Sequence, residues 1–260
     1  MAAFHNRSIG GISLLRIGTA GWALRKEHAA RFRGGDSHLA RYATRFNAVE
    51  INSSFYRPHQ PKTYARWARE TPDDFAFSVK MPKQITHELR LVEAQEALGR
   101  FMGECCALEE KLGCVLIQLP PSLGFAAGPA ATFFSALRNE YAGAAALEPR
   151  NKSWLSDGAE KLLIDFRIAR VAADPVPASM KTGPASEPSG FTGLQYLRLH
   201  GSPKIYYANY EPDFLDALAG RIAKERTGAD VWCIFDNTAL GHATENALEL
   251  RALLQKEHGD

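Results

Sequence analysis

Eight short apolar runs punctuate the sequence, and segments with apolar residues at three- and four-residue spacing separate most of them. The runs, which we expect to be strands, are 14–18, 48–52, 75–80, 114–118, 144–148, 169–174, 194–200 and 231–236. The segments that we expect to be helices are 36–46, 61–70, 93–112, 129–141, 155–166, 213–226 and 244–255. This alternation predicts an α/β fold whose parallel strands close into a (β/α)8 TIM barrel, and 260 residues is an ordinary length for one such domain. We therefore expect an N-terminal tail over residues 1–12 and a single barrel domain over residues 13–260.

Two features refine this expectation. An open, doubly wound parallel sheet is the alternative, but its usual nucleotide role needs a Gly-rich phosphate turn after an early strand. The turn at 18–22 is too short and too bulky for that role. The connection 175–193 carries four prolines and several Gly and Ser residues, so it predicts a loop in place of most of the sixth helix. That loop is either a lid over a site or a surface excursion.

Polar residues gather at the carboxyl ends of the predicted strands. Because side chains alternate faces along a strand, residues two apart share a face. In the fifth run Glu148 shares a face with Ala146, and in the seventh Arg198 and His200 share one with Tyr196. The large aliphatic residues fall on the opposite, helix-facing side. This parity predicts a polar interior at the upper end of the barrel, formed by Glu50, Asn52, Lys80, Gln118, Glu148, Arg150, Asp174, Arg198, His200 and Asp236.

This composition suits chemistry on a small anionic or sugar-like ligand. Crowded carboxylates beside cations acquire different pKa values, which lets one carboxyl act as an acid and another as a base. The predicted catalytic residues are Glu50, Glu148, Asp174, His200 and Asp236. The predicted ligand-binding residues are Trp22, Asn52, Tyr56, Lys80, Gln118, Arg150, Trp154, Arg198 and Asn237. In this prediction cations anchor an anion, amides orient the ligand and aromatic rings enclose it. The alternative is a ring of salt bridges that satisfy one another and hold the barrel mouth together.

Two further function classes are open. Carboxylates together with His87, His200 or His242 could make a metal-assisted hydrolase. Cations that point into the same mouth disfavour that arrangement, so neither a metal nor another cofactor is predicted. A non-catalytic binder of nucleic acid or of an anionic metabolite is suggested by the cations beside aromatic residues, namely Lys80, Arg150, Lys152, Arg198 and Lys204. A net charge of +2, from 31 basic and 29 acidic residues, would confine nucleic acid to a local groove.

The remaining composition favours a cytoplasmic protein. No apolar run approaches the length of a membrane span, so no membrane partner is expected, and Met1 to Gly11 lacks the apolar core of a secretory signal. The four cysteines form no C-x-x-C pair, which favours buried free thiols in a reducing compartment.

The set of strand-end motifs resembles domain of unknown function 72 (DUF72). The matching segments are 17–22 (IGTAGW), 49–56 (VEINSSFY), 77–80 (FSVK), 85–87 (ITH), 118–122 (QLPPS), 148–154 (EPRNKSW), 197–201 (LRLHG) and 235–237 (FDN). The resemblance covers roughly residues 14–255 and implies a (β/α)8 barrel, but no reaction. The family pattern often has His where this chain has Asn151, and Asn where it has Asp236. Both differences change the charge or the proton-transfer options at the mouth, so no family role carries over to either position.

Overall fold

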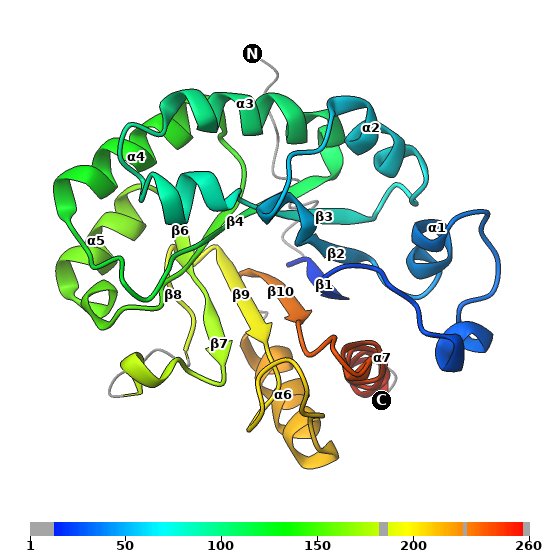
Figure 1. Ribbon diagram of the computed structural model, residues 1–260. Coiled ribbons are helices and arrows are strands. Elements are labelled where there is room, and N and C mark those ends of the chain that lie inside the picture. The colour runs from blue at the N-terminus through cyan, green and yellow to red at the C-terminus, as the bar shows by residue number, and fades with distance from the viewer. Residues whose placement is uncertain (1–12, 182–186, 226–227, 257–260) are drawn as a thin grey trace.

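The fold is α/β and is built on parallel strands, as predicted (Figure 1). A computed structural model describes residues 13–181, 187–225 and 228–256, so the expected tail over 1–12 lies outside the described residues. One sheet has the order β1-β10-β9-β7, from β1 (Leu15–Thr19), β10 (Asp230–Phe235), β9 (Leu194–Leu199) and β7 (Ala172–Asp174). The other has the order β2-β3-β4-β5-β6-β8, from β2 (Ala48–Ile51), β3 (Ala76–Lys80), β4 (Leu112–Gln118), β5 (Ala145–Glu148), β6 (Ile168–Arg170) and β8 (Ser189–Gly190).

The two sheets adjoin at two places. Ala20, just after β1, forms a single parallel bridge with Glu50 of β2. β6 and β7 belong to one chain run and are separated only by Val171, whose N–H donates to the Leu147 carbonyl. In the described residues the strands therefore form two hydrogen-bonded sheets, and the second is mixed because β8 pairs antiparallel with β6. The strand pairing therefore does not confirm the uniformly parallel, closed sheet that the sequence predicted. The contact between β1 and β2 is a single bridge, and the predicted sixth strand is divided into β6 and β7.

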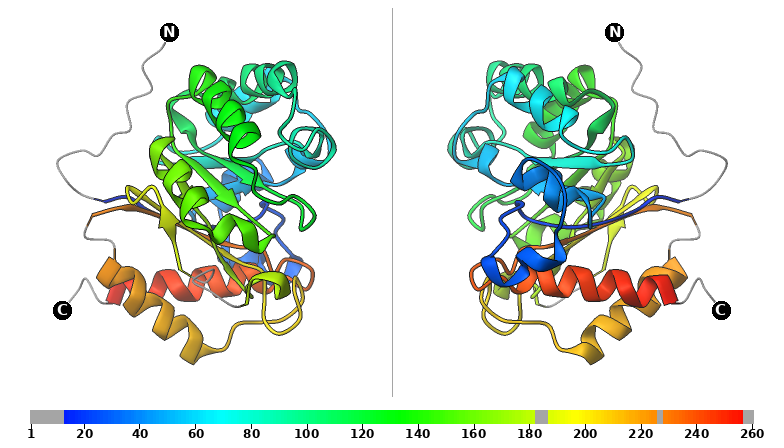
Figure 2. Two further views of the ribbon diagram at one scale, coloured as in Figure 1. Left: turned by 90° about the vertical axis from the view of Figure 1, so that its left-hand side faces the viewer. Right: turned by 90° about the vertical axis from the view of Figure 1, so that its right-hand side faces the viewer.

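The predicted helices are present, most with small shifts at their ends, but the segment predicted over 93–112 ends as an α-helix at Cys105 and continues as a 3₁₀ turn. They are α1 (His38–Ala43), α2 (Pro61–Arg69), α3 (Gln95–Cys105), α4 (Ala127–Glu140), α5 (Asp157–Asp165), α6 (Pro212–Glu225) and α7 (His242–Lys256). Their starts follow local chemistry: Ser37 and Ser156 accept backbone N–H groups at the first turns of α1 and α5, and Pro61 opens α2. Figure 1 shows α2 to α5 arching over the larger sheet, whereas α6 and α7 lie beside β9 and β10. Both views of Figure 2 place α6 next to α7.

Short helical turns connect several strands to the helices that follow. Five are 3₁₀ turns: η1 (Lys26–Arg31), η2 (Ser53–Phe55), η4 (Cys106–Lys111), η5 (Lys152–Leu155) and η6 (Ala178–Met180). A sixth, η3 (Gln84–Glu88), is a π-helical turn. Within 175–193 the described residues contain η6 and β8 but no α-helix, as the proline content predicted. The loop, for which the sequence left a lid and a surface excursion open, falls partly on 182–186, which lie outside the described residues.

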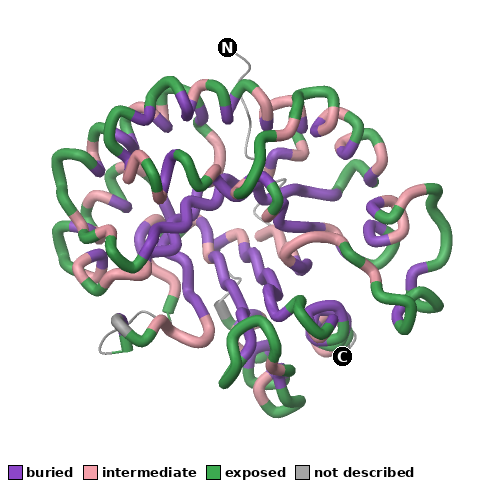
Figure 3. The backbone as a smooth tube through the Cα atoms, in the orientation of Figure 1, coloured by how far each residue is buried: buried purple, intermediate pink, exposed green. Residues whose placement is uncertain are grey.

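Two apolar clusters support the strands, and Figure 3 shows the buried residues concentrated along them. The larger cluster lies between the strands and the helices. The smaller one occupies what we call the inner face, the side of the strands that points between the two sheets. Small residues such as Ala48, Ala76 and Ala146 leave room there for Tyr196 and Trp232, whose rings stack with centroids 5.9 Å apart. The lower inner face is therefore filled by side chains, and polar residues take over toward the carboxyl ends.

No helix in the described parts of the chain is both long and apolar enough to span a membrane.

Candidate functional site

Strand register brings polar residues from five strands to one end of the inner face. In the parallel ladders Glu50 pairs with Ser78, Gln118 with Glu148 and Lys80 with Leu116, so these positions share the inner face. Arg198 lies on the same side of β9 as Tyr196, while His200 and Asp236 directly follow β9 and β10. We call Glu50, Glu148, Arg198, His200 and Asp236 the ion cluster.

Arg198 forms the centre of the ion cluster and is fully buried. Its Nε and Nη2 donate to the two carboxylate oxygens of Glu50, at 2.9 and 2.6 Å. Nη1 donates to Glu148 Oε2 at 2.6 Å, and Nη2 also donates to Asp236 Oδ2 at 3.0 Å. The planar guanidinium thus joins three carboxylates that come from three different strand ends. Arg198 is thus engaged with three carboxylates of the protein itself, and the ligand-anchoring role expected from the sequence stays a prediction.

His200 lies between two of the same carboxylates. Its Nδ1 is 3.0 Å from Asp236 Oδ2, and its Nε2 is 3.3 Å from Glu148 Oε1. Burial acts to lower the pKa of His200, but Glu148 and Asp236 outweigh it, so the net shift is upward. The imidazole is therefore held in its protonated form over a wider pH range than a free histidine.

Two carboxylates of the ion cluster, Glu148 and Asp236, are held ionised. Burial acts to raise the pKa of Glu148, yet Arg198, His200 and Arg150 together hold it well below its usual range. Burial likewise acts to raise the pKa of Asp236, but Arg198 and His200 outweigh it, so the net shift is downward. Gln118 Nε2 adds a hydrogen bond to Glu148 Oε2 at 2.9 Å. The sequence predicted that one of these crowded carboxyls would become an acid, but neither pKa is shifted in that direction.

Lys80 differs from the other charged residues at this end. Its side chain is almost fully buried, and its Nζ lies 4.3 Å from the ring centroid of Phe55 in η2. Among the described residues, no hydrogen bond or ion pair reaches Nζ. Burial first, and Arg198 second, lower the pKa of Lys80 to about 8, although Glu50, Glu148 and Asp236 act in the opposite direction. Lys80 is therefore close to titrating at physiological pH.

Further cations surround His87, on the π-helical turn η3. Its ring stands edge-on to Phe55, with centroids 5.0 Å apart, and its Nδ1 is 2.8 Å from Thr86 Oγ1. Partial burial lowers the pKa of His87, and four positive charges lower it further: Lys80, Arg150, Lys83 and Arg90. The side chain of Arg150 is 27% exposed and pairs with Glu148 at 3.2 Å. The edge of the site is thus positive, and π-helical turns often occur at functional positions.

Asp174 does not join the ion cluster. It pairs in register with Leu199, so it lies on the helix-facing side of β7, and its Oδ2 accepts from the Tyr210 hydroxyl at 2.9 Å. The predicted parity of this strand was wrong by one residue, because Ala172 and Ala173 are equally small and give no signal for which face is inner. The catalytic role expected for Asp174 is therefore not supported by its position.

The three aromatic residues predicted to enclose a ligand have different environments. Trp154 is 1% exposed, donates from Nε1 to the Leu123 carbonyl at 3.0 Å and packs against Phe125. The Trp22 ring meets Trp67 edge-on at 5.0 Å. Tyr56 is 78% exposed. Trp154 is a core residue, because the turn after β5 directs it back under the following helix.

The predicted amide residues have different environments. Asn237 is fully buried, and its Nδ2 donates to the Ala208 carbonyl at 3.0 Å and to Asn246 Oδ1 at 2.9 Å. Its Oδ1 has no hydrogen-bond partner among the described residues. Asn52 follows β2, and its Oδ1 is buried without a hydrogen-bond partner in the described structure. Gln118 contacts Glu148, as described above.

Three contributing residues were not predicted as part of the site. Phe55 contacts both Lys80 and His87. The Tyr196 hydroxyl lies 3.0 Å from Glu50 Oε2 and 2.7 Å from Ser78 Oγ, which ties the two sheets together. Tyr196 and Ser78 could have been found from strand parity, because each shares a face with a predicted site residue. Phe55 lies in a turn, where parity does not apply.

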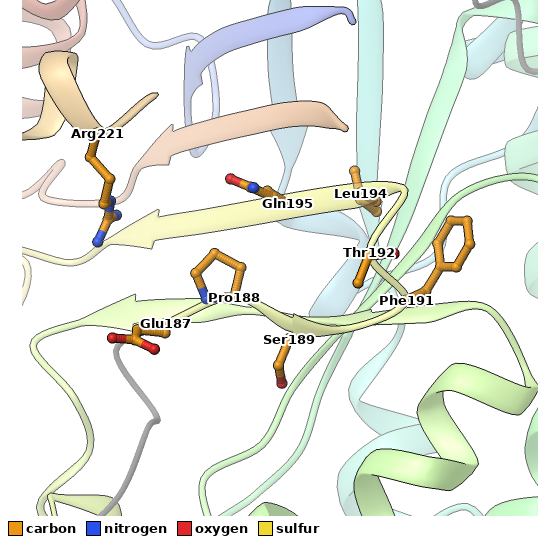
Figure 4. A pocket seen from close by; sticks show the side chains of 8 residues that line it. All are labelled: Glu187, Pro188, Ser189, Phe191, Thr192, Leu194, Gln195 and Arg221. Carbon is orange, nitrogen blue, oxygen red and sulfur yellow. The ribbon is translucent and has the colours of Figure 1, made fainter. Parts of the chain in front are cut away.

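A cavity of about 380 Å³ lies elsewhere. Figure 4 shows Gln195 of β9 and Arg221 of α6 lining it, together with residues 187–192 of the preceding loop. Gln195 is on the opposite face of β9 from Arg198, so this cavity is separate from the ion cluster. The titratable side chains that the sequence predicted as a site therefore lie at the strand ends and do not line this cavity.

Within the described residues, no group of three or more His, Cys, Asp or Glu side chains has an arrangement that could hold a metal ion. Arg198 takes the central position between the carboxylates.

Comparison with known proteins agrees with this architecture. UPF0759 protein YecE of Escherichia coli K12 is 32% identical over 111 residues, which are 43% of this chain and only 39% of YecE. UPF0759 protein YunF of Bacillus subtilis 168 is 23% identical over 94% of this chain and 96% of its own length. A DUF72 family protein of Thermotoga maritima MSB8 has a solved structure with a TM-score of 0.75 and 23% identity, covering 93% of this chain and 99% of that one.

The sequence profile of a family described as "Protein of unknown function DUF72" matches residues 16–260. This chain therefore belongs to the DUF72 family.

Proposed function

We propose that this protein is an enzyme that carries out acid–base chemistry on a small anionic ligand at the carboxyl ends of its strands. One observation carries the proposal: His200 and Lys80 belong to the same site, and their surroundings raise the pKa of His200 and lower that of Lys80 to about 8. Two neighbouring groups whose pKa values are shifted away from their ordinary values in opposite directions are typical of an acid and a base that act together. The buried carboxylates keep His200 charged, so His200 is the acid in this proposal and Lys80 the base.

The positive edge of the site supports an anionic ligand. Besides Lys80, which is the base in this proposal, three cations act on His87: Arg150, Lys83 and Arg90. Arg150 is the partly exposed guanidinium at this edge and is suited to a carboxylate or a phosphate. In this proposal Arg150 takes over the anchoring role first expected of Arg198. Glu50 and Glu148 become positioning residues for Arg198 and His200 rather than the acid and base themselves.

A thermal-shift screen tests the binding part of the proposal. The probes are inorganic phosphate, sugar phosphates, nucleotides, simple sugars, oligonucleotides and divalent metals. A ligand at about 100 times its Kd adds about 2.7 kcal/mol to the free energy of unfolding, which raises the midpoint of a chain of this size by roughly 5–10 °C. We expect such a shift with a phosphate- or carboxylate-bearing probe, its loss in Arg150→Met, and its retention in Arg100→Met, an exposed arginine on α3. A shift with neutral sugars alone would overturn the anionic ligand.

Catalysis is tested by proton exchange. With the ligand from the screen in D₂O, an acid–base enzyme exchanges a ligand C–H hydrogen for deuterium or releases a product, and ¹H NMR detects both. We expect this reaction with the wild type and its loss in His200→Gln. Binding without exchange or product would favour the second candidate, a non-catalytic binder of an anionic metabolite. The observation that favours this candidate is that the ion cluster already pairs its own charges.

We further propose that the two sheets are parts of one closed (β/α)8 barrel. The Ala20–Glu50 bridge and the continuity of β6 with β7 support this arrangement, as does Tyr196 of one sheet lying within hydrogen-bond distance of Glu50 and Ser78 of the other. A crystal structure with β1 and β2 at the strand spacing of about 4.8 Å is expected, and a wider gap would contradict closure.

A further inference from the structure

The carboxylates around Lys80 are all engaged by other residues. Glu148 accepts hydrogen bonds from Arg198, Gln118 and Arg150. Asp236 accepts one from Arg198 and lies within hydrogen-bond distance of His200. Lys80 has no hydrogen-bond or ion-pair partner among the described residues. Its Nζ atom is nevertheless accessible to solvent, since it is not among the buried side-chain atoms that lack a hydrogen-bond partner. The amine is therefore buried in an apolar contact with Phe55, yet its terminal atom is reachable.

This environment favours a nucleophilic amine over a fixed positive charge. A lysine ammonium that has lost water without gaining a counter-ion deprotonates more easily, and the neutral form is the one that attacks carbonyl carbons. A pKa of about 8 leaves roughly a tenth of the amine neutral at pH 7 and half at pH 8. A surface lysine is almost entirely charged at both values.

We propose that Lys80 forms an imine with a small aldehyde or ketone that also carries a carboxylate or phosphate. This inference rests on the proposed anionic-ligand site, because Arg150, Lys83 and Arg90 would hold the negative group while the carbonyl reaches Nζ of Lys80.

The bond changes balance without an oxidant or a reductant. The neutral Nζ attacks the carbonyl carbon to form a C–N bond, and the carbonyl oxygen takes up a proton to give a carbinolamine. The C–O bond then breaks, a C=N bond forms, and the two hydrogens that leave nitrogen depart with the oxygen as one water. Protonation of the imine nitrogen makes the ligand an electron sink at the neighbouring carbon, which is where acid–base chemistry becomes easier.

Reductive trapping tests the imine. The full-length protein at pH 8 is incubated with pyruvate, with dihydroxyacetone phosphate or with uncharged propanal, and is then treated with sodium borohydride. Intact mass and peptide mapping locate the resulting secondary amine. We expect one adduct per chain, at Lys80, with at least one of the two anionic probes, enriched at least ten-fold over any other lysine. We expect it to be absent in Lys80→Met and unchanged in Lys161→Met, an exposed lysine on α5.

The outcomes separate this inference from the function on which it rests. Adducts spread evenly over surface lysines, or no adduct at Lys80, would overturn the imine. If inorganic phosphate still raises the thermal midpoint in that case, the anionic site stands without it. Trapping at Lys80 by propanal as efficiently as by the anionic probes would support the amine chemistry and overturn the anionic ligand. Because a methionine fills a similar volume in the apolar contact with Phe55, Lys80→Met is expected to fold.

Discussion

At the scale of single residues, Arg198 is the point on which the ion cluster depends. It joins Glu50, Glu148 and Asp236, all of them buried. Removing one partner of a buried ion network leaves uncompensated charges, and this costs more than the intact network contributes. The structure therefore makes Arg198 a positioning residue with a large effect on stability.

We expect Arg198→Met to lower the free energy of unfolding by about 3–5 kcal/mol, because three buried carboxylates lose their common partner. Urea denaturation measures the change. The matched control is Arg100→Met, which breaks an exposed pair with Glu96 and should change stability by no more than about 0.5 kcal/mol. A loss below about 1 kcal/mol for Arg198→Met would mean that the carboxylates become protonated or hydrated at little cost.

Lys80 should have the opposite effect on stability. Lys80→Met removes a buried amine without an ion-pair partner, so we expect the variant to be about 1–2 kcal/mol more stable at pH 7. The folded pKa of Lys80, about 8, lies below the ordinary lysine value of 10.5, so the unfolded chain binds more protons between these two values. The free energy of unfolding of the wild type should therefore rise as pH rises from 8 to 10.5, and the stability advantage of Lys80→Met should shrink. Denaturation at pH 7, 9 and 10.5 measures this, and a constant difference would contradict it.

At the scale of elements, β1 must approach β2 closely. A Cβ on Gly18 would lie 2.0 Å from the Ala48 carbonyl oxygen and 2.9 Å from the Tyr42 hydroxyl, so only glycine fits. The Tyr42 hydroxyl donates to that same carbonyl and accepts from the Thr19 N–H, which fixes the contact between the strands.

We expect Gly18→Ala to lower the free energy of unfolding by about 3 kcal/mol, because the clash is with backbone and cannot be relieved by a rotamer change. Gly99→Ala is the control. Gly99 lies inside α3 with open space around its Cα, so the same substitution there should stabilise by about 0.4–1 kcal/mol. Thermal denaturation of both variants tests the pair, and equal effects would contradict the close approach of β1 and β2.

The elements themselves could be predicted from sequence. Each of the eight apolar runs contains a strand, and each predicted helical segment contains a helix. The inner face was predicted correctly for β2, β3, β5 and β9, where polar or small residues alternate with large aliphatic ones. The rule failed at β7, because consecutive alanines carry no alternation and a one-residue error moves a side chain to the other face.

At the scale of the whole molecule, the ion cluster links stability to pH. Glu148 and Asp236 have lowered pKa values, so their contribution is present above their ordinary values and is lost as pH falls through the folded ones. His200 has a raised pKa, so its contribution is complete below about 6.5 and is lost as pH rises through the folded value. These three groups lie at the ends of three strands in two sheets, so their titration changes the stability of the whole fold.

We expect His200→Gln to be less stable than the wild type at pH 5.5–6.5, and we expect the difference to shrink as pH rises through the folded pKa of His200. The reason is that protonated His200 bridges two carboxylates, and the neutral form loses that attraction. Urea denaturation of both proteins from pH 5 to 9 measures it. A difference that grows with pH would mean that His200 is neutral in the folded protein.

The sequence by itself determined the order of strands and helices, and it determined that polar residues would meet at the carboxyl ends. Both follow from local alternation, which each segment carries in its own residues. Only the tertiary structure decided which charges pair. Arg198 pairs with three carboxylates, Trp154 packs in the core, and Lys80 lies against Phe55 with no counter-ion among the described residues. These outcomes depend on how far apart the strand ends lie and on how the turns after them fold back. Such distances are set by all the strands and helices packing together, and no single segment encodes them.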